Sequence, residues 1–311
     1  MDKLHISVSP HIRSSNTTQK IMLDVVISLL PAAIAGCIIF GLTALWVIIA
    51  CVASSVLFEY LFNLITKKTQ TVEDLSAVVT GLLLALNLPA NTPIWQCVIG
   101  SAFAIVIVKC IFGGLGCNLV NPAMTARVFM LIAFTNLATP FFPANSADAT
   151  SSATPLSDLA GSGSIPSLTD VLFGNIGGAI GETCKIALLI GGIYLIARRV
   201  ITWHIPVISI ATVFVFTFLL NGFDLMNALS WILSGGLILG AFFMATDYVT
   251  SPSTTKGKII FALGVGFFTT LIRLFGNYPE GVSFAILMMN ILCPYIEKFS
   301  KRKLFGGKDY E

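Results

Sequence analysis

Two polar stretches of this chain carry residue types that could do chemistry. The first runs from Asp148 to Thr154 with the sequence DATSSAT, and Pro155 follows it. A residue before proline favours an extended backbone, which keeps the Thr154 hydroxyl away from helical hydrogen bonding. A phosphate could therefore esterify this hydroxyl, with Asp148 orienting a metal ion or an approaching group. The residues alone are more typical of a Ser/Thr-rich loop of low complexity than of a modification site.

A glycine-rich stretch follows, from Gly174 to Lys185, and introduces an apolar segment. Gly181 and Thr183 lie where the free N–H groups of a helix start attract phosphate. Lys185 adds a positive charge beside them. These three residues are the predicted surroundings of a phosphate group.

The second polar stretch, GGLGCNLVNPAM, runs from Gly113 to Met124 and contains Asn118 and Asn121. Asn side chains pair with the amide and carbonyl edges of planar rings, and a helix start at Pro122 offers N–H groups and a positive dipole end. Asp247, at the end of a later apolar segment, belongs by the predicted topology to the same region. The pattern predicts a site for an uncharged or anionic heterocycle. The alternative is helix capping by Asn and Asp, with Arg127 reaching to the membrane interface.

Membrane helices must position these residues. The 311 residues are 56% hydrophobic and 11% charged, which lies outside the range of soluble domains. Crossing about 30 Å of hydrocarbon takes about 20 apolar residues in a helix. Ten segments are predicted, at 21–41, 45–65, 75–88, 94–112, 122–139, 181–197, 203–220, 226–245, 258–275 and 280–296. The seven cysteines are scattered singly, so neither a metal cluster nor a disulfide framework is indicated.

The basic residues predict the orientation. If the N-terminus is cytoplasmic and the segments alternate, all of the 18 Lys and Arg residues except Lys185 and Arg273 fall on the inner side. Both termini are then cytoplasmic, and the loop 140–180 that carries Thr154 is extracytoplasmic. Because topology accounts for the net charge of +3, the charge does not indicate a nucleic-acid site.

Breaks containing Gly and Pro recur once in each half of the chain, which predicts an inverted repeat of five helices in each half. Such breaks at membrane depth normally line a cavity enclosed by protein, although ordinary turns at the interface are the alternative. The predicted regions are a cytoplasmic segment, the first half, the extracytoplasmic loop, the second half and a basic tail, at 1–20, 21–139, 140–180, 181–297 and 298–311.

Several ionisable residues lie near the predicted helix ends, where we expect solvated interface positions. They are Asp24, Glu59, Glu73 and Asp74 toward the inside, and Glu182, Lys185, Arg273 and Glu280 toward the outside. No regular ladder of carboxylates crosses the predicted bilayer. A complete proton or sodium path is therefore not predicted from this chain alone.

The chain resembles the RnfD/NqrB family of membrane subunits of bacterial redox-driven ion pumps, and most closely the D-type subunit of the Rnf complex. The family's flavin attachment pattern, D-x-x-S/T-x-A-T, is matched by Asp148, Ser151, Ala153 and Thr154. Other matching stretches are SAVVTGLLLALNLP, GGLGCNLVNPAM, IGETCKIALLIGG, FFMATDYVTSP and NYPEGVSFAILMMN. The likeness covers nearly the whole chain.

The resemblance implies that Thr154 carries FMN through a phosphoester, attached by a flavin transferase that uses FAD as donor. It also implies a second, non-covalent flavin such as riboflavin, which we expect at Asn118, Asn121 and Asp247. The assembled complex is expected to couple electron transfer between ferredoxin and NAD⁺ to Na⁺ or H⁺ translocation. No iron–sulfur spacing or dinucleotide fingerprint occurs in this chain, so other subunits are expected to handle ferredoxin and NAD⁺. The implied partners are the A-type and E-type membrane subunits, the G-type flavoprotein, the B-type iron–sulfur subunit and the C-type NADH-binding subunit.

Two positions depart from the family pattern: Tyr248 stands where Pro is expected, and Cys184 where Ser is usual. Neither touches Thr154, although the packing around Tyr248 is put in doubt. Two other classes of function compete with an electron-transfer subunit. A small-solute channel or transporter also uses inverted repeats with broken helices, but leaves the Asp148–Thr154 pattern unexplained. A purely structural scaffold explains neither the breaks nor the loop.

Overall fold

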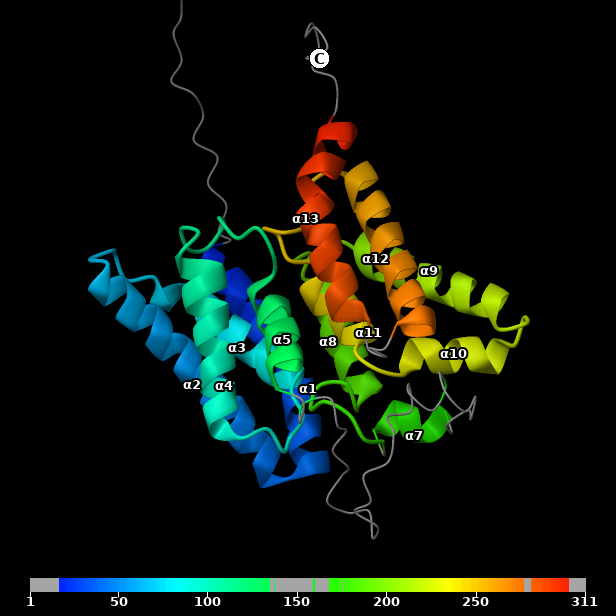
Figure 1. Cartoon of the computed structure of the whole chain (residues 1–311), viewed down its shortest axis with the longest axis horizontal. Helices are drawn as coiled ribbons and strands as arrows, with labels where there is room; N and C mark the ends of the chain where they lie inside the picture. Colours follow the sequence, from blue (N-terminus) through cyan, green and yellow to red (C-terminus); the bar gives the residue numbers. More distant parts are fainter. Residues whose placement is uncertain are drawn as a thin grey trace, which may run out of the picture.

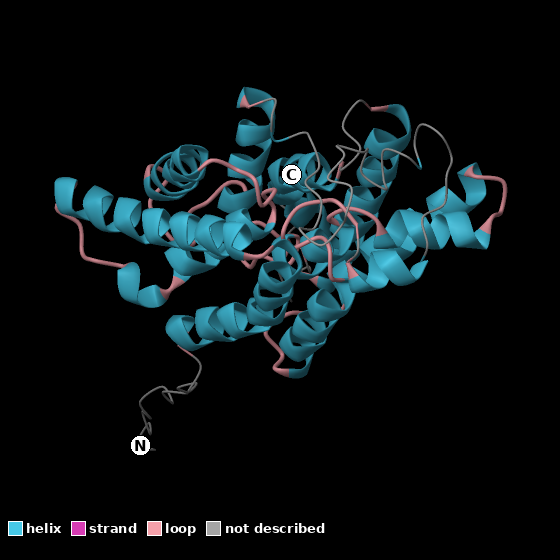
Figure 2. Cartoon of the chain, turned by 90° about the horizontal axis from the view of Figure 1, so that it is seen from below, coloured by secondary structure: helices cyan, strands magenta, loops and turns pink. Residues whose placement is uncertain are grey.

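A computed structural model describes residues 17–134, 137, 159, 168–174, 176–276 and 281–301 of the chain. Within these residues the structure is all helical and contains no strand (Figure 2). The helices are α1 (Thr18–Phe40), α2 (Leu42–Ile65), η1 (Val72–Asp74), α3 (Ser76–Leu86), α4 (Ile94–Ala102), η2 (Phe103–Cys110), α5 (Pro122–Ala133), α7 (Leu168–Phe173), α8 (Lys185–Ala197), α9 (His204–Leu220), α10 (Leu225–Leu233), α11 (Leu237–Leu239), η4 (Gly240–Met244), α12 (Thr255–Phe275) and α13 (Val282–Ser300). The predicted all-α membrane class is confirmed.

The four longest helices, α1, α2, α12 and α13, are long and apolar enough to cross a membrane. A fifth candidate is α10 together with α11 and η4, which are bent by 64° at a short break and form either a broken span or a re-entrant loop. The predicted continuous segment 226–245 is therefore wrong as a straight helix, because Gly235 takes a φ of 68° that turns the chain there. The Gly- and Pro-containing breaks predicted from the sequence did not include this one.

Shorter apolar helices lie at the other predicted segments: α3, α4 with η2, α5, α8 and α9. The 11 residues of α3 rise only about 16 Å at about 1.5 Å per residue, well short of the hydrocarbon thickness. The 13 residues of α8 are similarly short. The ends of such helices therefore lie inside the bundle, where other parts of the chain cover them.

The described helices form two groups (Figure 1). On one side α2 packs against α3 and α4, and on the other α9 packs against α10 and α12, which also contacts α13. The groups meet where α1 packs against α8 and α5 against α13. The inverted relation between the halves and their exact boundaries stay predictions.

Polar residues determine where several helices begin. The Thr17 hydroxyl accepts from the Lys20 N–H at the start of α1, and the Thr254 hydroxyl accepts from the Gly257 N–H at the start of α12. Asp224 accepts from two N–H groups at the start of α10. Each of these side chains satisfies donors that have no partner within the helix. Short polar side chains in an apolar sequence thus determine the helix register.

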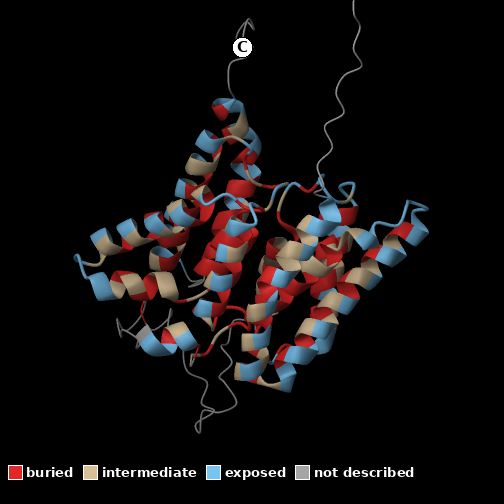
Figure 3. Ribbon diagram, turned by 180° about the vertical axis from the view of Figure 1, so that it is seen from behind, coloured by how far each residue is buried: buried red, intermediate tan, exposed pale blue. Residues whose placement is uncertain are grey.

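Buried residues gather in the middle of the bundle, and exposed residues lie on its outward faces (Figure 3). Large apolar side chains on these faces are freely exposed, among them Ile38, Ile65 and Phe275. A face this apolar matches hydrocarbon rather than water. The chain is a multi-pass membrane protein.

The predicted interface position is wrong for Glu59, Glu182, Lys185 and Arg273, which are all buried. Lys109 and Arg127, which were counted among the basic residues of the inner surface, are buried as well. The reason is that other parts of the chain pack over these side chains, on long helices such as α2 and α12 as well as on the short ones. Asp24 does lie near the surface, with an exposed partner in Arg198. Glu280 lies outside the described residues.

Candidate functional site

The structure brings Asn118, Asn121 and Asp247 together around one pocket. The pocket lies between the start of α1, α3, the start of α5, the end of α8 and the turn after η4. The space between its atoms is about 760 Å³, part of which is open to the surroundings. The cavity proper is about 90 Å³, smaller than the about 300–1,000 Å³ that is typical of pockets for small molecules. We call this space the inner pocket.

Asn121 both caps a helix and joins the two halves of the molecule. Its Oδ1 accepts from the N–H groups of Ala123 (3.0 Å) and Met124 (3.3 Å), which confirms the capping alternative for this residue. Its Nδ2 donates to the carbonyl of Met244 at 3.3 Å, at the end of η4. One side chain thus fixes the start of α5 against the broken helix.

Asn118 and Asp247 lie at the wall of the same pocket. The Oδ1 of Asn118 is buried without a hydrogen-bond partner, which is costly unless a ligand or water supplies a donor. The Asp247 carboxylate accepts from the N–H of Val249 (3.4 Å) and the hydroxyl of Thr250 (3.2 Å) in the turn that follows η4. Burial raises the pKa of the Asp247 carboxyl, and these two hydrogen bonds oppose the rise.

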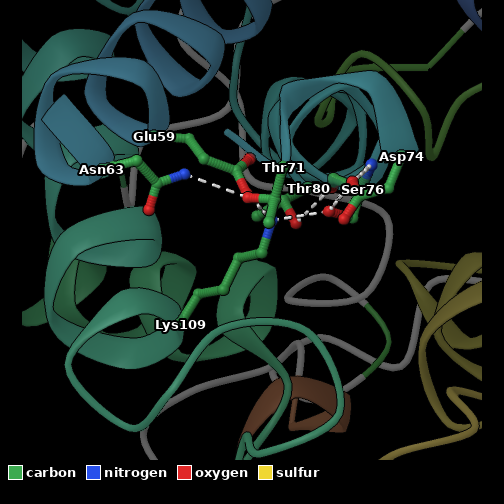
Figure 4. Close-up of polar contacts among 7 residues, drawn as sticks. All are labelled: Glu59, Asn63, Thr71, Asp74, Ser76, Thr80 and Lys109. Carbon is green, nitrogen blue, oxygen red and sulfur yellow. Dashed lines mark hydrogen bonds and ion pairs between the residues drawn. The ribbon is translucent and has the colours of Figure 1, made fainter. Parts of the chain in front are cut away.

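Lys109, at the end of η2, lies at the side of the inner pocket formed by Ser76 and Thr80 of α3. Its Nζ donates to Glu59 Oε1 at 2.8 Å and to Ser76 Oγ at 2.6 Å (Figure 4). The side chains of Lys109 and Glu59 are each 2% exposed. Opposite charges so deeply buried hold α2, α3 and η2 together at the edge of the pocket.

The network extends beyond this ion pair. The Thr71 hydroxyl donates to Glu59 Oε1 at 2.8 Å and accepts from Asn63 Nδ2 at 3.0 Å. The Ser76 hydroxyl donates to Asp74, whose carboxylate also accepts from the Ser76 N–H (Figure 4). Glu59 Oε2 is buried without a hydrogen-bond partner. We did not predict Lys109 as a pocket residue, although a lysine within an apolar run was the available signal.

Arg127 is buried on α5 and is not among the residues that line the inner pocket. The expectation that it reaches to the membrane interface is wrong, because α5 packs in the middle of the bundle, against α3 and α13. Tyr248, at the family position where Pro is expected, donates its hydroxyl to the carbonyl of Val200. It thereby joins the turn after η4 to the segment after α8.

The glycine-rich stretch before α8 packs on the end of α3. The N–H groups of Ile180 and Gly181 donate to the carbonyls of Leu88 (3.0 Å) and Leu86 (2.7 Å). The Thr183 hydroxyl donates to the Ile180 carbonyl at 3.3 Å. A phosphate bound by Gly181 and Thr183 would compete with these acceptors, and their role around a phosphate stays a prediction.

The predicted attachment residues, Asp148, Ser151, Ala153 and Thr154, lie outside the described residues. Leu159 is described, and it packs with Trp231 of α10 and Leu274 of α12. Cys184 stands in extended backbone at the N-cap of α8, where it makes no side-chain capping bond. All seven cysteines are free, and the described part of the chain holds no group of three or more side chains suited to a metal ion.

Comparison with known proteins gives matches over almost the whole length. The model of the NQR2, RnfD, RnfE family matches residues 5–306. The D subunit of the Na⁺-translocating ferredoxin:NAD⁺ oxidoreductase complex of Acetobacterium woodii is 48% identical, over 97% of this chain and 95% of the relative. The D subunit of the proton-translocating complex of Clostridium ljungdahlii is 42% identical, over 97% and 96%. The D subunit of an ion-translocating oxidoreductase complex of Stutzerimonas stutzeri is 38% identical, over 95% and 93%.

Proposed function

Because this chain belongs to the NQR2, RnfD, RnfE family, we propose that it is the D-type membrane subunit of an ion-translocating ferredoxin:NAD⁺ oxidoreductase complex. The observation that carries the proposal is the similarity to D-type subunits over almost the full length of both chains. The chain acts as one subunit of a translocase and contains no complete active site of its own. A channel or transporter without a redox cofactor leaves this similarity unexplained.

In this proposal Thr154 carries FMN through a phosphoester. The support is the DATSSAT sequence, in which Asp148, Ser151, Ala153 and Thr154 match the attachment pattern. The flavin supplies the electron-carrying chemistry, while the protein supplies position and electrostatics. A covalent tether also prevents loss of the cofactor from a loop that the distribution of basic residues predicts to be extracytoplasmic.

A second, non-covalent flavin such as riboflavin is proposed for the inner pocket. The unpaired Oδ1 of Asn118 suits an N–H donor on the edge of a planar ring. The Nδ2 of Asn121 already donates to Met244, so this residue positions the pocket wall more than it pairs with the ring. Lys109 adds ammonium N–H groups at another side of the pocket. Apolar side chains such as Leu83 and Phe243 complete the lining of the pocket.

The proposed partners are the A-type and E-type membrane subunits, the G-type flavoprotein, the B-type iron–sulfur subunit and the C-type NADH-binding subunit, with a flavin transferase for maturation. The chain relays electrons within the membrane part, with both termini in the cytoplasm. The relatives are named for different coupling ions, Na⁺ in Acetobacterium woodii and H⁺ in Clostridium ljungdahlii. Similarity therefore supports translocation of either Na⁺ or H⁺.

The test is flavin analysis of the full-length chain made in a host that contains the flavin transferase. After denaturation and electrophoresis, the wild-type band and a Thr150→Ala control are expected to fluoresce, and Thr154→Ala is expected to be dark. The amount of non-covalent flavin released when the same samples are denatured measures the occupancy of the inner pocket. An Asn118→Leu variant is expected to lower this amount about tenfold, because it loses a hydrogen bond to the ring. A fluorescent Thr154→Ala band would overturn the covalent site. Unchanged release from Asn118→Leu would remove that residue from the second site.

A further inference from the structure

The break between α10 and α11 leaves peptide carbonyls that need partners. α10 ends at Leu233 and α11 begins at Leu237, so the last carbonyls of α10 have no N–H from a following turn. Hydrocarbon offers no donors to such carbonyls, and an unsatisfied one at membrane depth costs several kcal/mol. Some other part of the protein must therefore cover this end of α10.

Two cationic side chains from elsewhere in the sequence cover it. Arg273 of α12 donates through Nη1 to the Trp231 carbonyl at 2.5 Å and through Nη2 to the Ser234 carbonyl at 3.2 Å. Lys185, the first residue of α8, donates through Nζ to the Gly235 carbonyl at 2.6 Å and to the Glu182 carbonyl. Both cations are almost completely buried, at 1% and 0% exposed.

A carboxylate lies beside the two cations. Glu182 is 7% exposed, and its Oε1 would lie 2.5 Å from a Cβ added to Gly236. With any other residue at position 236 the carboxylate would have to shift away from the broken helix. Glu182, Arg273 and the Cys184 thiol are the ionisable groups that act electrostatically on Lys185. The Lys185 ammonium is thus surrounded by peptide carbonyls and one nearby carboxylate.

This environment has the composition of a site for a monovalent metal ion. Unwound carbonyls and the C-terminal ends of half-helices coordinate Na⁺ in membrane proteins with broken helices. The helix dipole adds negative potential at the end of α10. An ammonium is a compact point charge, so it can occupy the place of such an ion.

We propose that Lys185 occupies a monovalent cation site formed by the carbonyls of Glu182 and Gly235, beside the carboxylate of Glu182. The chain itself supplies, as a tethered ammonium, the cation that a broken membrane helix otherwise takes from solution. The break in the wild-type protein is therefore held without dissolved Na⁺ or K⁺, and its stability does not follow their concentration. Removing the ammonium while leaving its space empty opens the site to a free ion.

The test compares variants of the full-length chain in detergent, in NaCl, KCl or choline chloride at equal ionic strength. Lys185→Ala removes the ammonium and leaves room, so its melting temperature in choline chloride is expected to fall below that of the wild type. NaCl or KCl is expected to raise it by about 5 °C through binding to the folded state. Lys185→Met is the matched control, because it fills the space without a charge or an oxygen ligand. Its melting temperature is expected to be low in all three salts, and that of the wild type equal in all three.

A second pair of variants tests the carboxylate and covers poor folding of the first. Lys185→Ser also leaves room and keeps an oxygen at the site, so it is expected to respond to the same ions. Adding Glu182→Gln to Lys185→Ala is expected to reduce the rise in melting temperature that NaCl or KCl causes. The proposal is overturned if neither small variant responds to Na⁺ or K⁺, if Lys185→Met responds equally, or if both small variants fail to fold at high NaCl and KCl.

Discussion

Two buried lysines at opposite ends of the bundle are satisfied in different ways. Lys109 shares the inner pocket with Ile21, near the start of α1, and its main partner is the carboxylate of Glu59. Lys185 follows the stretch in which Ile180 packs on Gly36, toward the end of α1, and its partners are peptide carbonyls. The first lysine belongs to an ion pair of two side chains, which has no net charge. The second donates to backbone carbonyls, with the carboxylate of Glu182 nearby.

This difference shows what each lysine depends on. A buried ion pair depends on both side chains, because the loss of one leaves the other as an uncompensated charge. When an ammonium held by carbonyls is removed, it leaves mostly neutral acceptors behind, here beside the Glu182 carboxylate, and another cation can satisfy them. We therefore expect the Lys109 site to tolerate substitution less than the Lys185 site in a medium that contains Na⁺ or K⁺.

Replacement of Lys109 by Met should have the largest effect on stability. It leaves the Glu59 carboxylate buried and unpaired, with an Oε2 that already has no hydrogen-bond partner. Breaking a buried pair in this way costs about 3–5 kcal/mol of the free energy of unfolding. The measurement is reversible unfolding in mixed detergent micelles, with the exposed Lys256→Met as control. A loss no larger than that of the control would show that the charge of Glu59 is compensated elsewhere.

Removal of both charges should cost less than removal of one. In Lys109→Met combined with Glu59→Leu, no charge is left buried, and Thr71 keeps its hydrogen bond from Asn63. Replacing a whole buried pair by apolar side chains is often close to neutral, so we expect the double variant to recover about 2 kcal/mol or more relative to Lys109→Met. The double-mutant cycle measures this coupling. If the stability losses of the two single variants simply add, Lys109 and Glu59 do not stabilise each other, and the contrast with Lys185 disappears.

The sequence predicted the helices and the residues of the inner pocket, but not how deeply the charges lie. Asn118, Asn121 and Asp247 could be grouped because topology alone places them at the same level of the membrane. The burial of Glu59 depends on which helix covers it, and hydropathy does not contain that information.

The use of backbone groups also escaped prediction. Gly181 was expected to offer its N–H to a phosphate, whereas that N–H docks on the Leu86 carbonyl. Leu86 lies at the end of a helix that is too short to cross the membrane. The length of α3, rather than any motif, creates the acceptor, and single-sequence patterns locate helix ends only approximately.

The smallest effect on stability should come from the N-terminal end of α10. There the free backbone groups are satisfied by a neighbouring side chain, Asp224, and not by cations from distant helices. Asp224 Oδ1 accepts from the N–H groups of Met226 (2.9 Å) and Asn227 (3.4 Å) at an exposed position. Asp224→Ala should lower the free energy of unfolding by about 1 kcal/mol, the usual cost of losing an N-cap. Asp224→Asn keeps the acceptor and should stay within a few tenths of a kcal/mol of the wild type, since Asn caps as well as Asp.

If both variants lose the same amount of stability, the charge of Asp224 acting on the helix dipole stabilises this end of α10. Since water reaches an exposed N-terminus, its free N–H groups find other acceptors, whereas the buried carbonyls at the far end of the same helix find none without Lys185 and Arg273.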